Sequence, residues 1–444
     1  MKSAAMEVRE LGRPTMQKVS RRLIPYLFVL YVAAYLDRIN IGFAQLQMKS
    51  ALGFSDTVYG LGAGIFFLGY FLFEVPSNLI LARVGARVWI ARIMITWGLI
   101  ASAMAIVRTP AEFYALRFLL GVAEAGFFPG VIYYLSQWFP AATRASAISR
   151  FMTAAAVSGI VGGPLSAALF KLDGMSGLAG WQWIFVAEGI PSVVLGVTTL
   201  WFLTDRPADA KWLSPADREH LERTMRSEAA DIARRGHLSL RDALLHPTVW
   251  RLSLLSFTLL VGLYGISFWL PQIVRSLSSG DNVEVALLSG IPYVAAAVAM
   301  VVVGAHSDRN RERCVHIAGA ALVGAAGLGA TAMIQTPVPG LIALSVAAMG
   351  VFSAIPVFWS LPTTFLSGTA AAGAIALINS LGNLAGFFGP YLIGRVRDLT
   401  GGFAGSLITI AVLLVGSAAL AISLRRSPAS EDEVRDGRIE AERP

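Results

Sequence analysis

The sequence predicts an all-α membrane protein with twelve transmembrane helices arranged in two six-helix halves. Of its 444 residues, 55% are hydrophobic and only 14% are charged, whereas soluble domains carry about 25% charged residues. Apolar segments long enough to cross a bilayer as helices recur about twelve times along the chain. One long polar stretch separates the first six of these segments from the last six, which indicates the division into halves.

The predicted spans cover 22–44, 58–81, 88–107, 112–136, 146–170, 181–203, 250–273, 284–305, 314–335, 340–362, 370–394 and 402–424. The expected organisation is therefore an N-terminal tail over 1–21, a first half over 22–203, a central loop over 204–249, a second half over 250–424 and a C-terminal tail over 425–444. The first 20 residues are polar and mixed in charge, unlike a cleavable signal peptide. The polar tail from Ser427 is expected to be disordered.

The basic residues predict the orientation of the spans. Most Lys and Arg residues fall in the tails, the central loop and the connections on the same side of the membrane, which is the pattern of cytoplasmic segments. Both termini are therefore expected in the cytoplasm, and the net charge of +8 needs no nucleic-acid partner to explain it. The basic residues expected on the opposite side are Lys49, Arg108, Lys171, Arg275, Arg395 and Arg397.

The two halves share sequence marks at a constant offset. Arg83 follows the second span and Arg309 follows the eighth, 226 positions later. The pair Gly163-Pro164 in the fifth span and the pair Gly389-Pro390 in the eleventh are also 226 positions apart. Two matches at one offset indicate an internal duplication, as in many transporter folds.

Charged residues inside the spans are the main functional signal. Asp37 and Arg38 lie within the first span, where a charge costs about 2.5–3.5 kcal/mol on insertion scales unless it has a partner. Arg117 and Glu124 are seven positions apart in the fourth span, so they share one helix face. Adjacent helical residues point about 100° apart. We therefore expect Asp37 to pair with Arg117, and Arg38 to pair with Glu124.

These charges admit two interpretations. In the structural one, the ion pairs only hold helices together. In the functional one, the planar guanidinium of Arg38 binds a carboxylate bidentately. Glu124 then competes with that anion, and its protonation releases Arg38, so that a proton and an anion enter together. Asp37 is expected to be a second proton carrier. Glu74 and Glu188, also within spans, are expected to be structural.

The motifs resemble those of the major facilitator superfamily. The signature Gly-x-x-x-Asp-Arg occurs at Gly304 to Arg309 with Asp308 as its acid, and the first-half copy has Ala82 where an acid is expected before Arg83. A narrower resemblance, to the anion:cation symporter family, rests on the segments 35–40 (YLDRIN), 66–76 (FFLGYFLFEVP), 117–130 (RFLLGVAEAGFFPG), 181–189 (WQWIFVAEG) and 376–383 (ALINSLGN).

This resemblance implies a transporter of organic anions. Members include bacterial carriers for galactonate, tartrate and phthalate, and animal vesicular carriers for glutamate and sialic acid. The second-span histidine of the vesicular glutamate carriers is replaced here by Ala63. The chain is therefore similar to the bacterial, proton-symporting branch, which implies a multi-pass location in the bacterial inner membrane.

Three groups of residues are the candidate site. The expected substrate-binding residues are Arg38, Tyr35, Tyr70, Tyr264, Trp359, Asn379 and Asn383. The expected proton-coupling residues are Asp37, Glu124 and Arg117. The expected gating residues are Arg83, Gly304, Asp308 and Arg309.

Other chemistries lack support in the sequence. The single cysteine, Cys314, excludes a disulfide framework and a cysteine-based metal site. The five histidines show no ligand spacing, and there is no phosphate-binding loop of an ATPase. We expect no enzyme activity, no cofactor, no metal and a monomer. The predicted function is proton-coupled import of a hydroxy or sugar acid, such as tartrate or an aldonate, by alternating access. The alternatives are an aromatic, phthalate-like substrate, sodium coupling, or an uncoupled anion facilitator.

Overall fold

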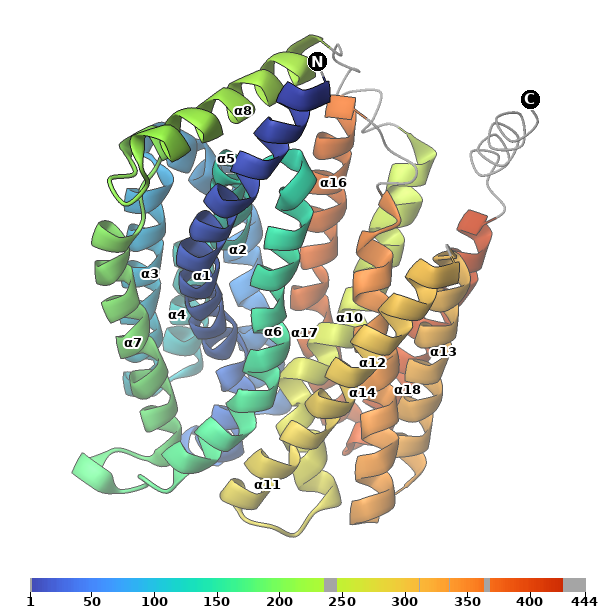
Figure 1. The fold of residues 1–444 in the computed structure, drawn as a ribbon. Coiled ribbons are helices and arrows are strands. Elements are labelled where there is room, and N and C mark those ends of the chain that lie inside the picture. The colour runs from blue at the N-terminus through green and yellow to red at the C-terminus, as the bar shows by residue number, and fades with distance from the viewer. Residues whose placement is uncertain (1, 235–245, 311, 335, 363–367, 426–444) are drawn as a thin grey trace. The chain divides into compact units, whose positions relative to one another are not determined.

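The computed structural model describes residues 2–234, 246–310, 312–334, 336–362 and 368–425, and its ordered elements in these ranges are all helices (Figure 1). Eleven of these helices or helix pairs are long and apolar enough to cross a membrane. The predicted all-α membrane fold is confirmed. The eleventh predicted span, over 370–394, corresponds to two shorter helices, α16 (Gly368–Asn383) and α17 (Ala385–Thr400), which meet at Leu384.

The chain order of the remaining helices follows the predicted spans. The first half contains α1 (Lys2–Leu52), α2 (Asp56–Val84), α3 (Ala86–Ala103), α4 (Pro110–Glu124), α5 (Phe127–Trp138), α6 (Ala141–Phe170) and α7 (Gly180–Phe202). The second half contains α10 (Pro247–Leu277), α11 (Asn282–Leu288), α12 (Gly290–Asn310), α13 (Cys314–Met333), α14 (Pro337–Trp359) and α18 (Phe403–Arg425), together with α16 and α17.

The fourth span is interrupted in its middle. Helix α4 ends at Glu124, Ala125 is extended, and α5 begins after Gly126, whose φ of 87° lies in the left-handed region. A side chain at Gly126 would be strained by that φ and would also meet Ser77, so the position requires glycine. The break leaves carbonyl groups at the end of α4 without helical partners, directly beside Glu124.

Two polar segments have more helix than the sequence indicated. Helix α1 begins at Lys2 rather than near residue 22, so the described part of the N-terminal tail continues the first span. The predicted central loop contains α8 (Pro215–Arg234), a charged helix stabilised in part by Arg223–Glu219 and Arg226–Glu222 ion pairs. Residues 235–245 and the predicted disordered tail from Ser427 lie outside the described residues.

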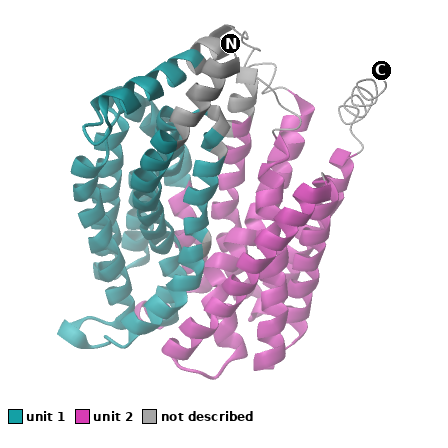
Figure 2. Ribbon diagram, viewed as in Figure 1, with its two compact units in different colours: residues 1–47, 68–236 teal, residues 48–67, 237–444 magenta. Residues whose placement is uncertain are grey.

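The contacts divide the chain into two compact units (Figure 2). Unit 1 comprises residues 1–47 and 68–236, and unit 2 comprises residues 48–67 and 237–444. The end of α1 and the first part of α2 therefore belong with the second unit by their contacts. The predicted domain limits describe the sequence repeat and stay a prediction.

Small residues allow close helix packing inside each unit. In unit 1, α3 packs along α7, where an added Cβ at Gly98 would lie 2.6 Å from the carbonyl oxygen of Gly189. In unit 2, α13 packs against α14 and α18, and Gly327 approaches the backbone of Ala347. Such contacts replace the hydrophobic driving force that is missing between helices in lipid.

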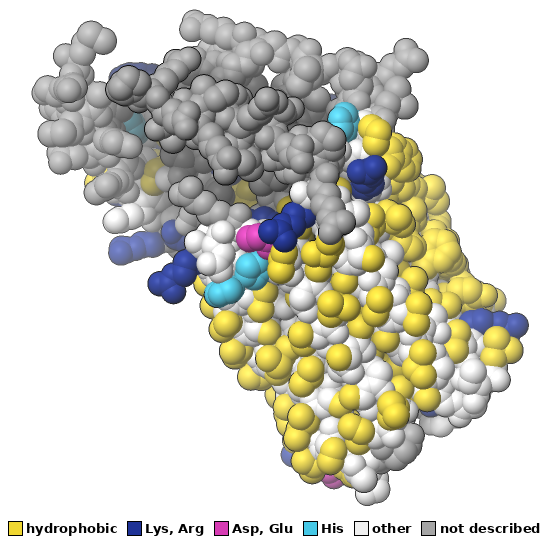
Figure 3. Space-filling view, turned by 90° about the vertical axis from the view of Figure 1, so that its right-hand side faces the viewer, with side chains coloured by type: hydrophobic (Ala, Val, Ile, Leu, Met, Phe, Trp, Pro, Cys, Tyr) yellow, Lys and Arg dark blue, Asp and Glu magenta, His cyan; other side chains and the backbone are white. Residues whose placement is uncertain are grey.

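The outer surface is apolar, as a bilayer requires. Large hydrophobic side chains are strongly exposed, among them Trp201 at 74% and Val301 at 72%. Figure 3 shows hydrophobic side chains covering most of the described surface in that view. A surface of this kind has to be covered by lipid or by a partner.

Candidate substrate and coupling site

Arg38 and Glu124 form an ion pair inside unit 1. Arg38 lies on α1, and Glu124 is the last residue of α4; their side chains are only 12% and 1% exposed. The guanidinium of Arg38 also lies 5.6 Å from the centre of the Tyr70 ring on α2, a cation–π distance. This pairing confirms the prediction that the first-span arginine meets the acid of the fourth span.

The break between α4 and α5 adds to the electrostatics of this pair. Cations are favoured near the C-terminal end of a helix, where carbonyl groups concentrate partial negative charge. Arg38 pairs with Glu124 at that end of α4, and Nη1 of Arg92 on α3 donates to the carbonyl oxygen of Ala123 at 3.4 Å. Two arginines therefore approach the end of α4. No motif or spacing in the sequence indicated this position of Arg92.

Asp37 has different partners from the one predicted. Its Oδ2 accepts a hydrogen bond from Trp97 Nε1 at 2.7 Å and another from Ser192 Oγ at 2.9 Å. Its Oδ1 accepts a longer bond from Asn40 Nδ2 at 3.4 Å. The expected ion pair with Arg117 is wrong, because the carboxylate faces α3 and α7 rather than α4. The side chain is 2% exposed, so these neutral donors replace its hydration.

Arg117 lies on α4 with Glu124, as the seven-residue spacing predicted, and it is fully buried. Its charge acts on the Glu124 carboxylate. Two more acids are buried in this unit: Glu74 on α2 at 6% exposure and Glu188 on α7 at 7%. Glu188 lies one turn before Ser192, and the Ser192 hydroxyl contacts both its backbone carbonyl and the Asp37 carboxylate. Glu188 thus belongs to the same buried network as Asp37.

The remaining substrate-binding candidates fall in both units. Tyr35 is half-buried on α1, where its ring meets Tyr31 edge-on. In unit 2, the Tyr264 hydroxyl donates to Asn383 Oδ1 at 3.5 Å, so the structure brings these two candidates together. The other candidates of unit 2 are half-buried: Asn379, one turn before Asn383 on α16, and Trp359, the last residue of α14.

The ion pairs near the two predicted gating signatures differ between the halves. In the second half, Asp308 pairs with Arg313, while Arg309 is exposed and Gly304 half-buried. In the first half, Ala82 and the exposed Arg83 offer no acid. Asp205, after α7, takes that place. Its Oδ1 accepts the backbone N–H of Arg87 at 2.8 Å, and its Oδ2 lies 3.7 Å from the Arg87 guanidinium.

A second ionic cluster, which we call the α2 latch, was missed by sequence analysis. Asp56, the first residue of α2, pairs with Lys49 at the end of α1 and with Arg397 on α17 at 2.8 Å. Asp398 accepts the backbone N–H groups of Asp56 at 3.2 Å and Thr57 at 2.7 Å, and so caps α2 from another helix. Partial burial acts to raise the pKa of Asp398, but hydrogen bonds from Thr57 and Asp56 outweigh it and hold the pKa below its ordinary value.

No metal site accompanies these charges: among the described residues, no group of three or more His, Cys, Asp or Glu side chains could hold a metal ion. The nearest approach is the pair His306 and His316, whose ring nitrogens Nδ1 and Nε2 lie 2.7 Å apart.

The arrangement of spans and charges matches a known family. The model of the Major Facilitator Superfamily matches residues 27–390. The chain belongs to the major facilitator superfamily. It is therefore a multi-pass membrane transporter, and the predicted family membership is confirmed.

Relatives and solved structures agree with this assignment. A protein of Agrobacterium vitis named "Putative tartrate transporter" is 50% identical over 426 residues, covering 96% of this chain and 94% of the relative. "Putative metabolite transport protein NicT" of Pseudomonas putida is 46% identical over 409 residues, covering 92% and 93%. The fold resembles the crystal structure of a bacterial homologue of the human lysosomal transporter Spinster, with a TM-score of 0.74, 17% identity and coverage of 94% and 98%.

Proposed function

We propose that this protein is a proton-coupled symporter that imports a small organic anion across the bacterial inner membrane, with both termini in the cytoplasm. The observation that carries the proposal is the ion pair of Arg38 with Glu124 at the interrupted end of α4. A guanidinium paired with a carboxylate is a site that a second carboxylate, from a ligand, can occupy in exchange.

The exchange of partners supplies the coupling. When Glu124 takes up a proton, it loses the charge that holds Arg38, and the guanidinium becomes available to an anion. When the anion leaves, Arg38 must recover a negative partner, which favours release of the proton from Glu124. Proton and anion therefore bind together and leave together, which is the requirement for symport.

Asp37 is suited to a second, separate proton. Its Oδ2 is occupied by Trp97 and Ser192, while Oδ1 faces only the Asn40 amide at 3.4 Å. A proton on Oδ1 leaves the two short bonds in place. Arg117, which acts on Glu124 from the same helix, is proposed to limit how far that acid can move toward other partners.

The substrate class follows from the chemistry around Arg38 and from the relatives. One accessible guanidinium suits one strongly bound carboxylate. The relative named as a tartrate transporter favours a hydroxy acid. If the substrate is instead an aromatic acid, its ring would pack against the Tyr70 ring, which lies beside Arg38.

The α2 latch is proposed as part of alternating access. It joins the start of α2 to α17, one helix from each half of the sequence repeat. A transporter that opens alternately on two sides must break such contacts in one of its states.

Uptake by proteoliposomes tests the proposal. Radiolabelled tartrate, an aldonate and phthalate are offered with an inward proton gradient, with a protonophore, and with sodium replaced by choline. We expect accumulation of a hydroxy acid that collapses with the protonophore and ignores sodium. Strict dependence on sodium at constant pH, or equilibration without accumulation, would replace the proposal by sodium coupling or by facilitated diffusion.

A further inference from the structure

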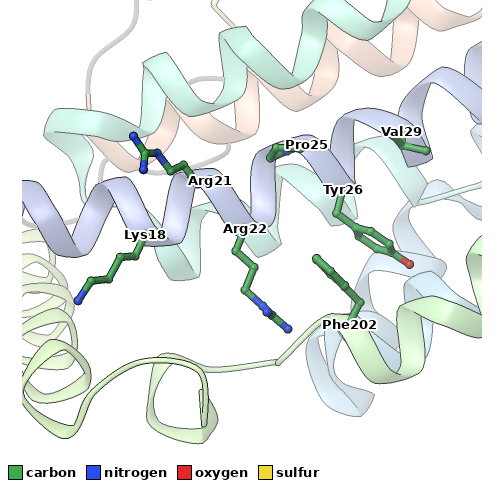
Figure 4. A pocket seen from close by; sticks show the side chains of 7 residues that line it. All are labelled: Lys18, Arg21, Arg22, Pro25, Tyr26, Val29 and Phe202. Carbon is green, nitrogen blue, oxygen red and sulfur yellow. The ribbon is translucent and has the colours of Figure 1, made fainter.

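A basic groove beside residues 18–29 of α1 is not used by the transport site. It has a volume of about 650 Å³ and lies entirely in unit 1. The residues of α1 that line it recur at helical spacing and, apart from Arg21, lie toward one face of the helix; Phe202, at the end of α7, closes one side. Figure 4 shows them: Lys18, Arg21, Arg22, Pro25, Tyr26, Val29 and Phe202.

The guanidinium of Arg22 is held in an aromatic stack. Its central carbon lies 4.7 Å from the centre of the Phe202 ring and 5.0 Å from that of Trp212. Tyr26 stacks on Phe202 at 4.1 Å, so the column extends along the groove. The rings cover the faces of the guanidinium and leave its N–H edge for hydrogen bonding.

Among the described residues, the two arginines of the groove form no ion pair with an acid, although Arg22 also borders a cavity that Asp205 and Asp209 line. Lys18 is committed to Asp217 on α8 at 2.7 Å. Hydrogen bonds from Lys18 and Thr15 lower the pKa of Asp217 to about 2, so that pair stays ionised. In the described part of the chain no acid pairs with Arg22, whose Nε is buried without a hydrogen-bond partner. Arg21 is exposed, and Figure 4 shows it extending to the side of α1 opposite Arg22.

The other end of the groove is apolar and open. Pro25 is exposed, Val29 is 46% exposed, and both lie inside the predicted first span, which begins near residue 22. Arg22 and Val29 are seven residues apart, or about 10 Å along a helix. The groove therefore runs from cations at the polar boundary of the membrane to a hydrocarbon-facing surface, within the length of one lipid molecule.

We propose that this groove binds an anionic phospholipid of the phosphatidylglycerol class. Arg22 binds the phosphate through the N–H edge that the rings leave open, Arg21 adds positive charge on α1 beside it, and one acyl chain lies along Pro25, Val29 and Phe202. A phosphate with no neighbouring ammonium matches the unbalanced charge, and the apolar floor favours a lipid over a free anion. The proposed membrane orientation enters only in the choice of leaflet, which is the cytoplasmic one.

Native mass spectrometry of the purified full chain tests this site. Dioleoyl phosphatidylglycerol and dioleoyl phosphatidylcholine are titrated separately, because they share acyl chains and differ in headgroup charge. We expect tighter binding of the first phosphatidylglycerol, and weakening on the order of thirtyfold in Arg21→Gln/Arg22→Gln, given about 1 kcal/mol for each basic residue near an anionic lipid surface and about 1.4 kcal/mol per factor of ten. Phosphatidylcholine binding should not change.

The matched control is Arg108→Gln/Lys171→Gln, which removes two exposed cations in the α3–α4 and α6–α7 connections, away from the groove. It should bind phosphatidylglycerol like the parent chain. The single variant Arg21→Gln, at an exposed position, gives an intermediate loss without disturbing the aromatic stack. Equal affinity for the two lipids, or equal losses in both double variants, would overturn the proposal. Displacement of the lipid by millimolar inorganic phosphate would instead assign the groove to small anions.

The readout does not depend on transport. A chain that binds phosphatidylglycerol at this groove but fails to accumulate organic acids would refute the proposed symport and leave the lipid site standing. A chain that transports normally but shows no lipid preference would refute the lipid site and leave the proposed symport standing.

Discussion

Replacing Glu124 with Gln tests the coupling mechanism most directly, because it imitates a permanently protonated acid. The variant keeps the size of the side chain and one carbonyl oxygen near Arg38, but it removes the charge that holds the guanidinium. We expect Glu124→Gln to bind substrate and to exchange it across the membrane. Proton-driven accumulation should be lost, because no proton is released at this position when the empty carrier returns.

The size of the effect follows from the Arg38–Glu124 contact. A hydrogen bond to a charged group contributes about 1.5–3 kcal/mol, and both side chains here are largely removed from water. An anion that binds Arg38 in the parent protein at neutral pH must displace this contact. Without it, substrate affinity at pH about 7.5 should rise by about 10- to 100-fold, at 1.4 kcal/mol per factor of ten. The pH dependence of binding should flatten, since the variant no longer titrates at this position.

Isothermal titration of the preferred acid between about pH 5.5 and 8 measures this affinity. Counterflow of labelled substrate and gradient-driven uptake in liposomes then separate exchange from accumulation. The control is Glu112→Gln, in the first turn of the same helix, where the acid is exposed and bonds the backbone of Arg108. Full concentrative uptake by Glu124→Gln, with an unchanged pH profile, would show that Glu124 is structural and would leave Asp37 as the leading proton carrier.

Three further outcomes are expected. Arg38→Lys should fold but lose uptake almost completely, since an ammonium cannot form the planar bidentate contact; near-normal substrate affinity in a binding titration would contradict the anchor role. Ser192→Ala should shift the pH profile of uptake more than it lowers substrate affinity, since it removes one of the two short hydrogen bonds to Asp37; an unchanged profile would separate Asp37 from coupling. The pKa of Asp398 is lowered in the folded protein, so the ionised carboxylate stabilises the α2 latch. This stabilisation is fully present above the ordinary Asp pKa of about 3.9, and it is lost as the pH falls through the lowered value. The Thr57 amide should therefore stay protected from hydrogen exchange at about pH 5.5, and loss of protection there would show that the latch itself responds to outside acid.

The Arg38–Glu124 pair could be predicted from the sequence for two reasons. A charge in the middle of a span needs a partner, and Arg117 and Glu124 share a face of α4. The same reasoning failed for Asp37 because it considered only charged partners. Trp97 and Ser192 are neutral residues on α3 and α7, and nothing in their local sequence marks them as ligands of a carboxylate. Neutral donors can satisfy a buried acid, and charge patterns do not reveal them.

The helix interruptions and the α2 latch show a second limit. The break between α4 and α5 has a sequence signal, because Gly126 and Pro129 follow Glu124 closely. The length of the apolar segment alone nevertheless predicts one continuous span. The latch joins Asp56 to Arg397 across more than three hundred residues of sequence. From the sequence, Arg397 is only one of the few basic residues expected on the side of the membrane opposite the termini. Pairing over such a distance depends on tertiary structure, which periodicity does not encode.

The charge balance of unit 1 bears on the choice between proton and sodium coupling. Its described spans bury more carboxyl groups than guanidinium groups: the acids are Asp37, Glu74, Glu124 and Glu188, and the arginines at or near them are Arg38, Arg92 and Arg117. An incoming anion adds a negative charge to a region where uncompensated charge is costly. A cation that enters with the anion would offset this charge, which supports the proposed coupling. Sodium needs several oxygen ligands, yet the Asp37 and Glu124 carboxylates are approached by N–H and O–H donors, which repel a metal ion. A proton needs only one carboxylate oxygen, and Oδ1 of Asp37 accepts just the long 3.4 Å hydrogen bond from Asn40 among the described residues. These contacts support the proposed proton coupling over sodium coupling, and uptake with sodium replaced by choline is the measurement that distinguishes the two.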